Sequence, residues 1–199
     1  MSLSAQNANA LKDALRIFIK DCIVTVFEYG TAEEWSEAAS FLFEEGLHAE
    51  AVKCLTRGLY LEPDNGYLWF NLALVYRKQN RMIDSIHALK MATHFISDDA
   101  NLWDTVGVSL FELGDFETSF RAFENAFQHD QTSSRIWNNY GALLFNQKKY
   151  REAKDAFETA LLLDQENCDA FLNLADTYEE LDQTEKRAIC QEIIDKLDL

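Results

Sequence analysis

The sequence predicts an all-α fold in which pairs of antiparallel helices stack side by side as an α-solenoid. A 34-residue period runs through the chain, and its clearest mark is the spacing of the four tryptophans, Trp35, Trp69, Trp103 and Trp137. Within each period the apolar residues recur at helical spacing. One proline and seven glycines in 199 residues are also too few for the turns that a β-sandwich or β-barrel requires.

Other positions of the period repeat together with the tryptophans. Phe171 takes the fifth aromatic place. Four residues after each aromatic the residue is small: Ala39, Ala73, Gly107, Gly141 and Ala175. Sixteen residues after each tryptophan it is small again: Ala51, Ser85, Ser119 and Ala153. Because small residues let two helix backbones approach closely, these positions predict helix crossings.

Each period divides into two helices. The first helices are expected near 32–45, 66–79, 100–113, 134–147 and 168–181, and the second helices near 48–61, 82–95, 116–129 and 150–163. A good N-cap residue precedes each first helix: Thr31, Asn65, Asp99, Ser133 and Asn167. Thr31 and Glu34 form a capping-box pattern. The turn between the two helices holds Gly46, Asn80, Gly114 or Lys148, and the first three of these suit a left-handed C-cap.

These residues resemble the tetratricopeptide repeat family, whose pattern places an aromatic, Leu-Gly and Tyr in the first helix and Ala, Phe and Ala in the second. The second unit matches with Trp69, Leu72, Ala73, Tyr76, Ser85, Leu89 and Ala92. Pro63 stands in the family's proline place, but later units have Ser97, Gln131 and Gln165 there. The resemblance covers residues 32–181, with units starting at 32, 66, 100, 134 and 168, and implies a right-handed superhelix with a shared core.

The two ends are expected to differ from the repeats. Residues 182–199 predict a C-terminal capping helix, with a narrow stripe of Ile189, Ile193, Ile194 and Leu197. Residues 1–9 are expected to be disordered. Residues 10–31 predict an N-terminal helix with a broad apolar face, which must be covered. Three alternatives remain open: it caps the first repeat, it joins a second copy as a homodimer through residues 10–29, or it fills the chain's own groove.

The first helices also have a side that does not carry the core pattern, which we call the open face. It lies two residues before each aromatic and one, two, five, eight and nine residues after it. The resemblance implies that this face lines the concave surface and binds a peptide. The candidate groove residues are Tyr67, Phe70, Asn71, Leu74, Asp104, Thr105, Val108, Phe111, Arg135, Asn138, Asn139, Ala142, Phe145 and Asn173.

Two interpretations of the open face compete. In the first, the aromatic strip binds side chains of an extended peptide while the recurring asparagines bind its backbone. In the second, the aromatics pack between repeats and the asparagines bond to neighbouring helices. The sequence alone leaves both open.

Charge limits the choice of partner. The chain has 34 acidic and 18 basic residues, a net charge of −16. Such a surface repels phosphate backbones, so nucleic acid is not an expected partner. A protein or peptide partner is expected, and a basic or extended one fits the field best. No run reaches the roughly 18 apolar residues needed to span a membrane.

The motifs of common catalytic and metal sites are not found. No phosphate loop, zinc-protease motif, nucleophile elbow or EF-hand loop occurs, so no catalytic residue, metal or cofactor is predicted. Four cysteines without CxxC spacing indicate a reducing compartment, and the cytoplasm is expected. The sequence favours a non-enzymatic protein- or peptide-binding scaffold or adaptor. The alternative is a bacterial secretion-type chaperone that self-associates through its N-terminal helix.

Overall fold

The computed structural model describes residues 30–196, and these residues form α-helices joined by short turns. The chain divides into two compact units that are joined between Ile96 and Ser97. The predicted disordered segment 1–9 and the predicted helix up to residue 29 lie outside the described residues, as does Leu197. Gly30 is not helical, and Thr31 is the N-cap of the first helix that follows.

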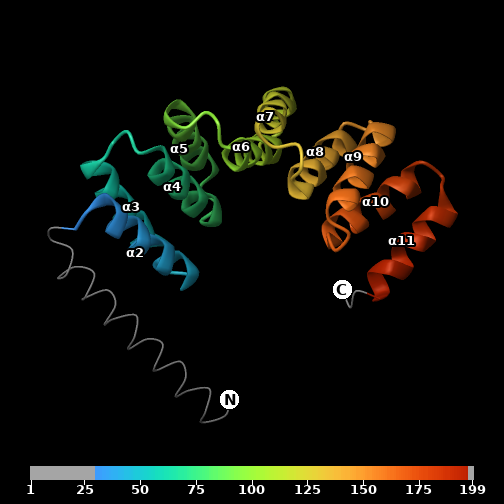
Figure 1. The fold of residues 1–199 in the computed structure, drawn as a ribbon, viewed down its shortest axis with the longest axis horizontal. Helices are drawn as coiled ribbons and strands as arrows, with labels where there is room; N and C mark the ends of the chain where they lie inside the picture. The colour runs from blue at the N-terminus through green and yellow to red at the C-terminus, as the bar shows by residue number, and fades with distance from the viewer. Residues whose placement is uncertain (1–29, 197–199) are drawn as a thin grey trace, which may run out of the picture. The chain divides into compact units, whose positions relative to one another are not determined.

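Helices pair along the chain in each compact unit (Figure 1). The first unit contains α2 (Ala32–Glu44), α3 (His48–Leu61), α4 (Gly66–Lys78) and α5 (Met82–Phe95). The second contains α6 (Ala100–Glu112), α7 (Phe116–His129), α8 (Ser134–Asn146), α9 (Tyr150–Leu163), α10 (Cys168–Glu180) and α11 (Thr184–Lys196). The four second helices, α3, α5, α7 and α9, have the predicted bounds. Each first helix ends one residue earlier than predicted.

The caps form as predicted. Thr31 and Glu34 make a reciprocal capping box, and the side chains of Asn65, Asp99, Ser133 and Asn167 each accept a backbone N–H of the helix that follows. The turn residues all have positive φ: 73° at Gly46, 59° at Asn80, 79° at Gly114, 60° at Lys148 and 57° at Asp182. Lys148 therefore adopts the left-handed conformation although its side chain does not favour it, because the turn geometry requires it.

Three of the four half-buried tryptophans form hydrogen bonds to the backbone. In three repeats the indole Nε1–H donates to a backbone carbonyl six residues earlier. These bonds run from Trp69 to Pro63 at 2.9 Å, from Trp103 to Ser97 at 2.7 Å and from Trp137 to Gln131 at 2.9 Å. The accepting residue lies in the loop that leads into the first helix. The recurring tryptophan thus fixes the connection between successive repeats, a role that phenylalanine, with no donor, cannot fill.

We expect Trp137→Phe to lower the free energy of unfolding by about 1–2 kcal/mol, because the ring contacts largely remain while the bond to Gln131 and some apolar area are lost. Urea unfolding followed by far-UV circular dichroism measures this. An unchanged unfolding midpoint would show that the bond contributes nothing to the repeat connection.

The small residues four positions after the aromatics face side chains rather than bare backbone. A Cβ added at Gly107 would lie 2.9 Å from Cε1 of Phe123, and one at Gly141 would lie 2.6 Å from Cε1 of Phe157. The two repeats of the first compact unit have Ala39 and Ala73 at this position. They have Leu55 and Leu89 where the second compact unit has Phe123 and Phe157. All four of these large side chains are buried. Glycine thus accompanies the phenylalanine ring, and alanine the smaller leucine.

The small residues of the second helices do approach the backbone, as predicted. The buried hydroxyl of Ser85 donates to the carbonyl of Ala73 at 2.9 Å, and that of Ser119 donates to the carbonyl of Gly107 at 2.7 Å. These bonds satisfy polar groups that would otherwise be buried without a partner. They tie α5 to α4 and α7 to α6.

The last helix, α11, packs differently from the expected stripe. Cys190 and Ile194 are buried and Ile193 is half-buried, whereas Ile189 is 58% exposed. Ile189 therefore does not belong to the packed stripe, because the helix turns Cys190 rather than Ile189 toward α10 and α9.

Burial raises the pKa of Cys54, in α3, to about 11, so this thiol stays protonated and unreactive near neutral pH.

Candidate functional site

The candidate site is the open face of the first helices, and in the second compact unit α6, α8 and α10 carry it. Here α6 contacts α8 and α8 contacts α10, so each first helix packs against the next as well as against its own second helix. This second contact separates the predicted groove residues into two groups. Some lie between neighbouring first helices, and others remain accessible.

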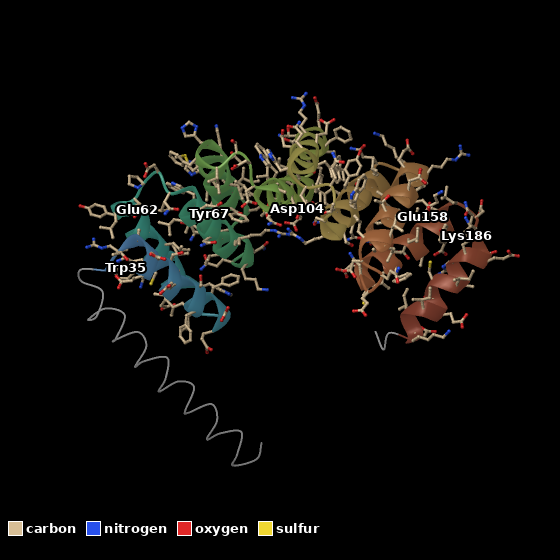
Figure 2. All side chains as sticks on the ribbon, in the orientation of Figure 1. Trp35, Glu62, Tyr67, Asp104, Glu158 and Lys186 are labelled. Atoms are coloured by element: carbon tan, nitrogen blue, oxygen red, sulfur yellow. The ribbon has the colours of Figure 1, made fainter. Side chains whose placement is uncertain are left out.

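Three predicted groove residues lie between helices. Asp104 is 1% exposed, and Thr105 and Asn138 are also buried. Asp104 lies on α6, where Figure 2 labels it. These three residues occupy the positions one and two residues after the aromatic, where the next or preceding first helix packs. The expectation that their side chains line an accessible groove must be corrected for these three.

Asp104 is the centre of a polar network that joins α6 to α8. Nη1 of Arg135 lies 2.8 Å from Oδ2 of Asp104, and Nδ2 of Asn139 donates to Oδ1 at 2.9 Å. Nη2 of Arg135 also donates to Oδ1 of Asn101 at 2.7 Å. Because the carboxylate is buried while the Arg135 side chain is 54% exposed, the network fixes a guanidinium at the edge of the open face.

The recurring asparagines bond to neighbouring first helices. Nδ2 of Asn173 donates to Oδ1 of Asn138 at 2.9 Å, and Nδ2 of Asn71 donates to Oγ of Ser36 at 3.4 Å in the first unit. With Asn139, each bond spans 35 residues, one period plus one. These amides therefore serve packing between repeats, which was one of the two interpretations. At Asn71 and Asn173 this bond uses one of the two Nδ2 N–H donors, and the carbonyl oxygen of the side chain keeps its capacity to accept a hydrogen bond from a ligand.

The accessible part of the face in the second compact unit includes a group of apolar side chains. Phe111, Ala142 and Phe145 are half-buried and border a recess of about 200 Å³. The buried ring of Phe157 and the side chains of Asn146, Asn173 and Asp176 complete its lining. Val108 on α6 is half-buried, too.

The first unit has a related recess of about 220 Å³ between α2, α3 and α4. Of the predicted residues, Asn71 and Leu74 line it, whereas Phe70 is half-buried and Tyr67 is exposed without lining it. Figure 2 labels Tyr67 at the start of α4. The recess is completed by Ala39, Ser40, Phe43, Glu44, Leu55 and Val75.

Phe43 and Glu44 were not among the predicted residues, whereas Asn146 and Asp176 were expected on the open face but not among the groove residues. A signal for them exists, because all four stand five, eight or nine residues after an aromatic of the period, at open-face positions. Phe43 in particular occupies the position in the first repeat that Phe111 and Phe145 occupy in the third and fourth repeats. The candidates came from the second to fifth repeats alone, so the matching residues of the first repeat were missed.

Among residues 30–196, no group of three or more His, Cys, Asp or Glu side chains is placed to hold a metal ion. In the same part of the chain, none of the helices combines the length and the apolar character needed to cross a bilayer.

Together, the helix pairs, the 34-residue period and the caps define a helical-repeat solenoid protein. Two tetratricopeptide repeat family models match the chain, one over residues 134–167 and one over residues 169–196. The chain therefore contains tetratricopeptide repeats in these two segments. The matched segments correspond to the repeats that begin with α8 and α10.

Solved structures with the same fold include repeat proteins of similar size. A MamA protein is 14% identical with a TM-score of 0.72, covering 84% of this chain and 91% of that one. PilW, described as a type IV pilus biogenesis factor, is 17% identical with a TM-score of 0.79, covering 83% of this chain and 77% of that one. PilF of Pseudomonas aeruginosa is 20% identical with a TM-score of 0.77, covering 83% and 75%. At these identities the likeness concerns the fold.

Two curated relatives are similar in sequence over part of the chain. The BBSome complex member BBS4 of Xenopus tropicalis is 28% identical over 83 residues, which are 42% of this chain and 16% of the relative. The BBS4 homolog of Drosophila melanogaster is 28% identical over 86 residues, 43% of this chain and 18% of the relative. The chain thus matches less than a fifth of the length of either.

Proposed function

We propose that this protein is a non-enzymatic scaffold that binds an extended polypeptide segment on the open face of its first helices. The observation that carries the proposal is the group of accessible apolar side chains, Phe111, Ala142 and Phe145, around the recess of the second unit. Apolar side chains that gather on an accessible surface usually mark an interaction site. Aromatic anchors also supply a large share of the binding energy at protein interfaces.

The volumes of the two recesses favour a peptide over a small molecule as the ligand. Sites for drug-sized ligands usually enclose about 300–1,000 Å³. The two recesses, at about 200 and 220 Å³, are smaller and suit single side chains of a longer ligand. The similarity to two BBSome complex members adds support, since their description places those relatives in a protein complex.

The test is a selection of peptides from a phage-displayed random library, followed by titration of the selected peptides. Phe111→Ala/Phe145→Ala should weaken binding by roughly tenfold or more, because both aromatic anchors are lost. Leu162→Ala is the matched control, since Leu162 is a 79% exposed apolar residue on the second helix α9. It should leave the affinity unchanged.

A second variant separates binding from folding. Ala142→Lys fills the recess with a long charged side chain and removes no core residue. It should abolish binding while circular dichroism shows the same helix content. If the selected peptides bind all three variants as tightly as the unmodified protein, the open face is not the binding surface.

The predicted secretion-type chaperone role and the homodimer rest on residues 10–29, which lie outside the described residues. Both stay predictions. Light scattering of the full chain and of a chain lacking residues 1–29 checks them: a dimer that becomes a monomer supports them, and a monomer in both cases contradicts them.

A further inference from the structure

The two recesses on the open face occupy equivalent places in the repeat. Six lining positions of the first recess recur 102 residues later, three periods of 34, in the second. The equivalent pairs are Ser40 and Ala142, Phe43 and Phe145, Glu44 and Asn146, Leu55 and Phe157, Asn71 and Asn173, and Leu74 and Asp176. Each recess thus lies between one helix pair and the first helix of the next pair.

Each recess combines an apolar lining with one carboxylate, and the carboxylate stands at a different position of the repeat in the two recesses. In the first recess Glu44 lies at the end of α2, and the equivalent of Asp176 is Leu74. In the second recess Asp176 lies on α10, and the equivalent of Glu44 is Asn146. One acidic group is therefore present in each recess although neither position is acidic in both. Both carboxylates are exposed, and neither pairs with a cation among residues 30–196.

The other polar groups of the two recesses include acceptors for a ligand. Asn71 and Asn173 each use one of their two Nδ2 N–H donors on Ser36 or Asn138, and each has a side-chain carbonyl oxygen that can accept a hydrogen bond. The hydroxyl of Ser40 likewise donates within its own helix, to the carbonyl of Ser36 at 3.1 Å. No Lys, Arg or His belongs to either set of described lining residues. A ligand that brings hydrogen-bond donors, and a positive charge in particular, therefore fits the carboxylate and the carbonyl oxygen of each recess.

We infer that each recess accepts the side chain of a lysine or arginine from the bound polypeptide, an inference that rests on the proposed function. Such a side chain has an aliphatic stem that packs on the apolar lining and a charged end that stays near water. The ring of Phe43 or Phe145 can contact the cation by its face. Glu44 or Asp176, with the asparagine carbonyl, accepts its N–H donors. The net charge of −16 steers such a ligand toward the protein.

The test uses three synthetic peptides of equal length that alternate leucine with one variable residue. The variable residue is lysine, norleucine or glutamate, so that lysine and norleucine differ mainly by the amine. The lysine peptide should bind more tightly than the norleucine peptide, and the glutamate peptide should bind most weakly. In Glu44→Gln/Asp176→Asn the preference for lysine over norleucine should fall by roughly two- to fivefold per recess, the range for accessible ion pairs.

A charge-matched variant tests whether position matters. Glu124→Gln/Glu166→Gln removes two exposed carboxylates outside both recesses, one on the second helix α7 and one in a loop. It should leave the lysine preference nearly unchanged. Equal losses in the two variants would show that net charge alone attracts the lysine peptide, and would overturn the inference.

The remaining outcomes separate the inference from the proposed function. Equal affinity for the lysine and norleucine peptides, with both lost in Ala142→Lys, would overturn the inference and retain the peptide-binding face. Failure of all three peptides and of the library-selected peptides to bind would overturn both.

Discussion

Replacing Gly141 with alanine should lower the free energy of unfolding by about 1–2 kcal/mol. The added Cβ would lie 2.6–2.9 Å from three atoms of the Phe157 ring, and this ring is buried and cannot move into solvent. Overpacking of this kind costs about 1–3 kcal/mol. The higher helix propensity of alanine offsets up to about 1 kcal/mol of that cost. The unfolding midpoint in urea, followed by tryptophan fluorescence, measures the result.

The same pair of positions provides a rescue experiment. Gly141→Ala/Phe157→Leu recreates the alanine–leucine combination of the first unit, so the double variant should be more stable than the sum of its single changes predicts. Gly58→Ala is the control, because its new Cβ would meet the terminal methyl groups of Leu68, at 3.1 and 3.4 Å, and the carbonyl of Ala32. It should change stability less than Gly141→Ala does. Additive effects at Gly141 and Phe157 would contradict the size pairing.

Loss of Arg135 should destabilise the second unit by about 2–3 kcal/mol. Arg135→Ala removes the cation that lies 2.8 Å from the carboxylate of Asp104 and leaves that buried group with less charge compensation. Removing one member of a buried pair costs far more than removing one member of an exposed pair. Urea unfolding of the variant measures the loss.

An exposed ion pair in the same unit serves as the comparison. Arg121 and Glu117 lie 2.6 Å apart on α7, but their side chains are 70% and 81% exposed. Arg121→Ala should therefore change stability by less than about 1 kcal/mol. If Arg121→Ala lowers the free energy of unfolding as much as Arg135→Ala does, the burial of Asp104 does not determine how much the Asp104–Arg135 pair stabilises the protein.

The repeat itself could be predicted in detail from the sequence. The tryptophan spacing, the N-cap residues and the small positions each depend on contacts within one helix or one helix pair, and such local contacts leave a periodic trace. The bounds of α3, α5, α7 and α9 follow directly from it. Lys148 shows the limit of residue preference, because the turn imposes a positive φ on a residue that does not favour it.

The candidate site could be predicted only in part. Which open-face residues are buried depends on how one first helix packs against the next, and the pattern within a single helix does not contain that information. Asp104 and Asn138 were therefore expected to be accessible, but they are buried. The pairing of Asp104 with Arg135 joins residues of different repeats, and a comparison of charges between successive repeats would be needed to find it.

The central claim is that the open face of the first helices binds a polypeptide, and NMR chemical-shift mapping with a library-selected peptide tests it most directly. The claim predicts that the perturbed signals cluster at open-face residues such as Ala142, Phe145 and Asn173, while the exposed residues of α7 and α9 are unaffected. Perturbations confined to α7 and α9, with the open face unchanged at saturating peptide, would contradict it.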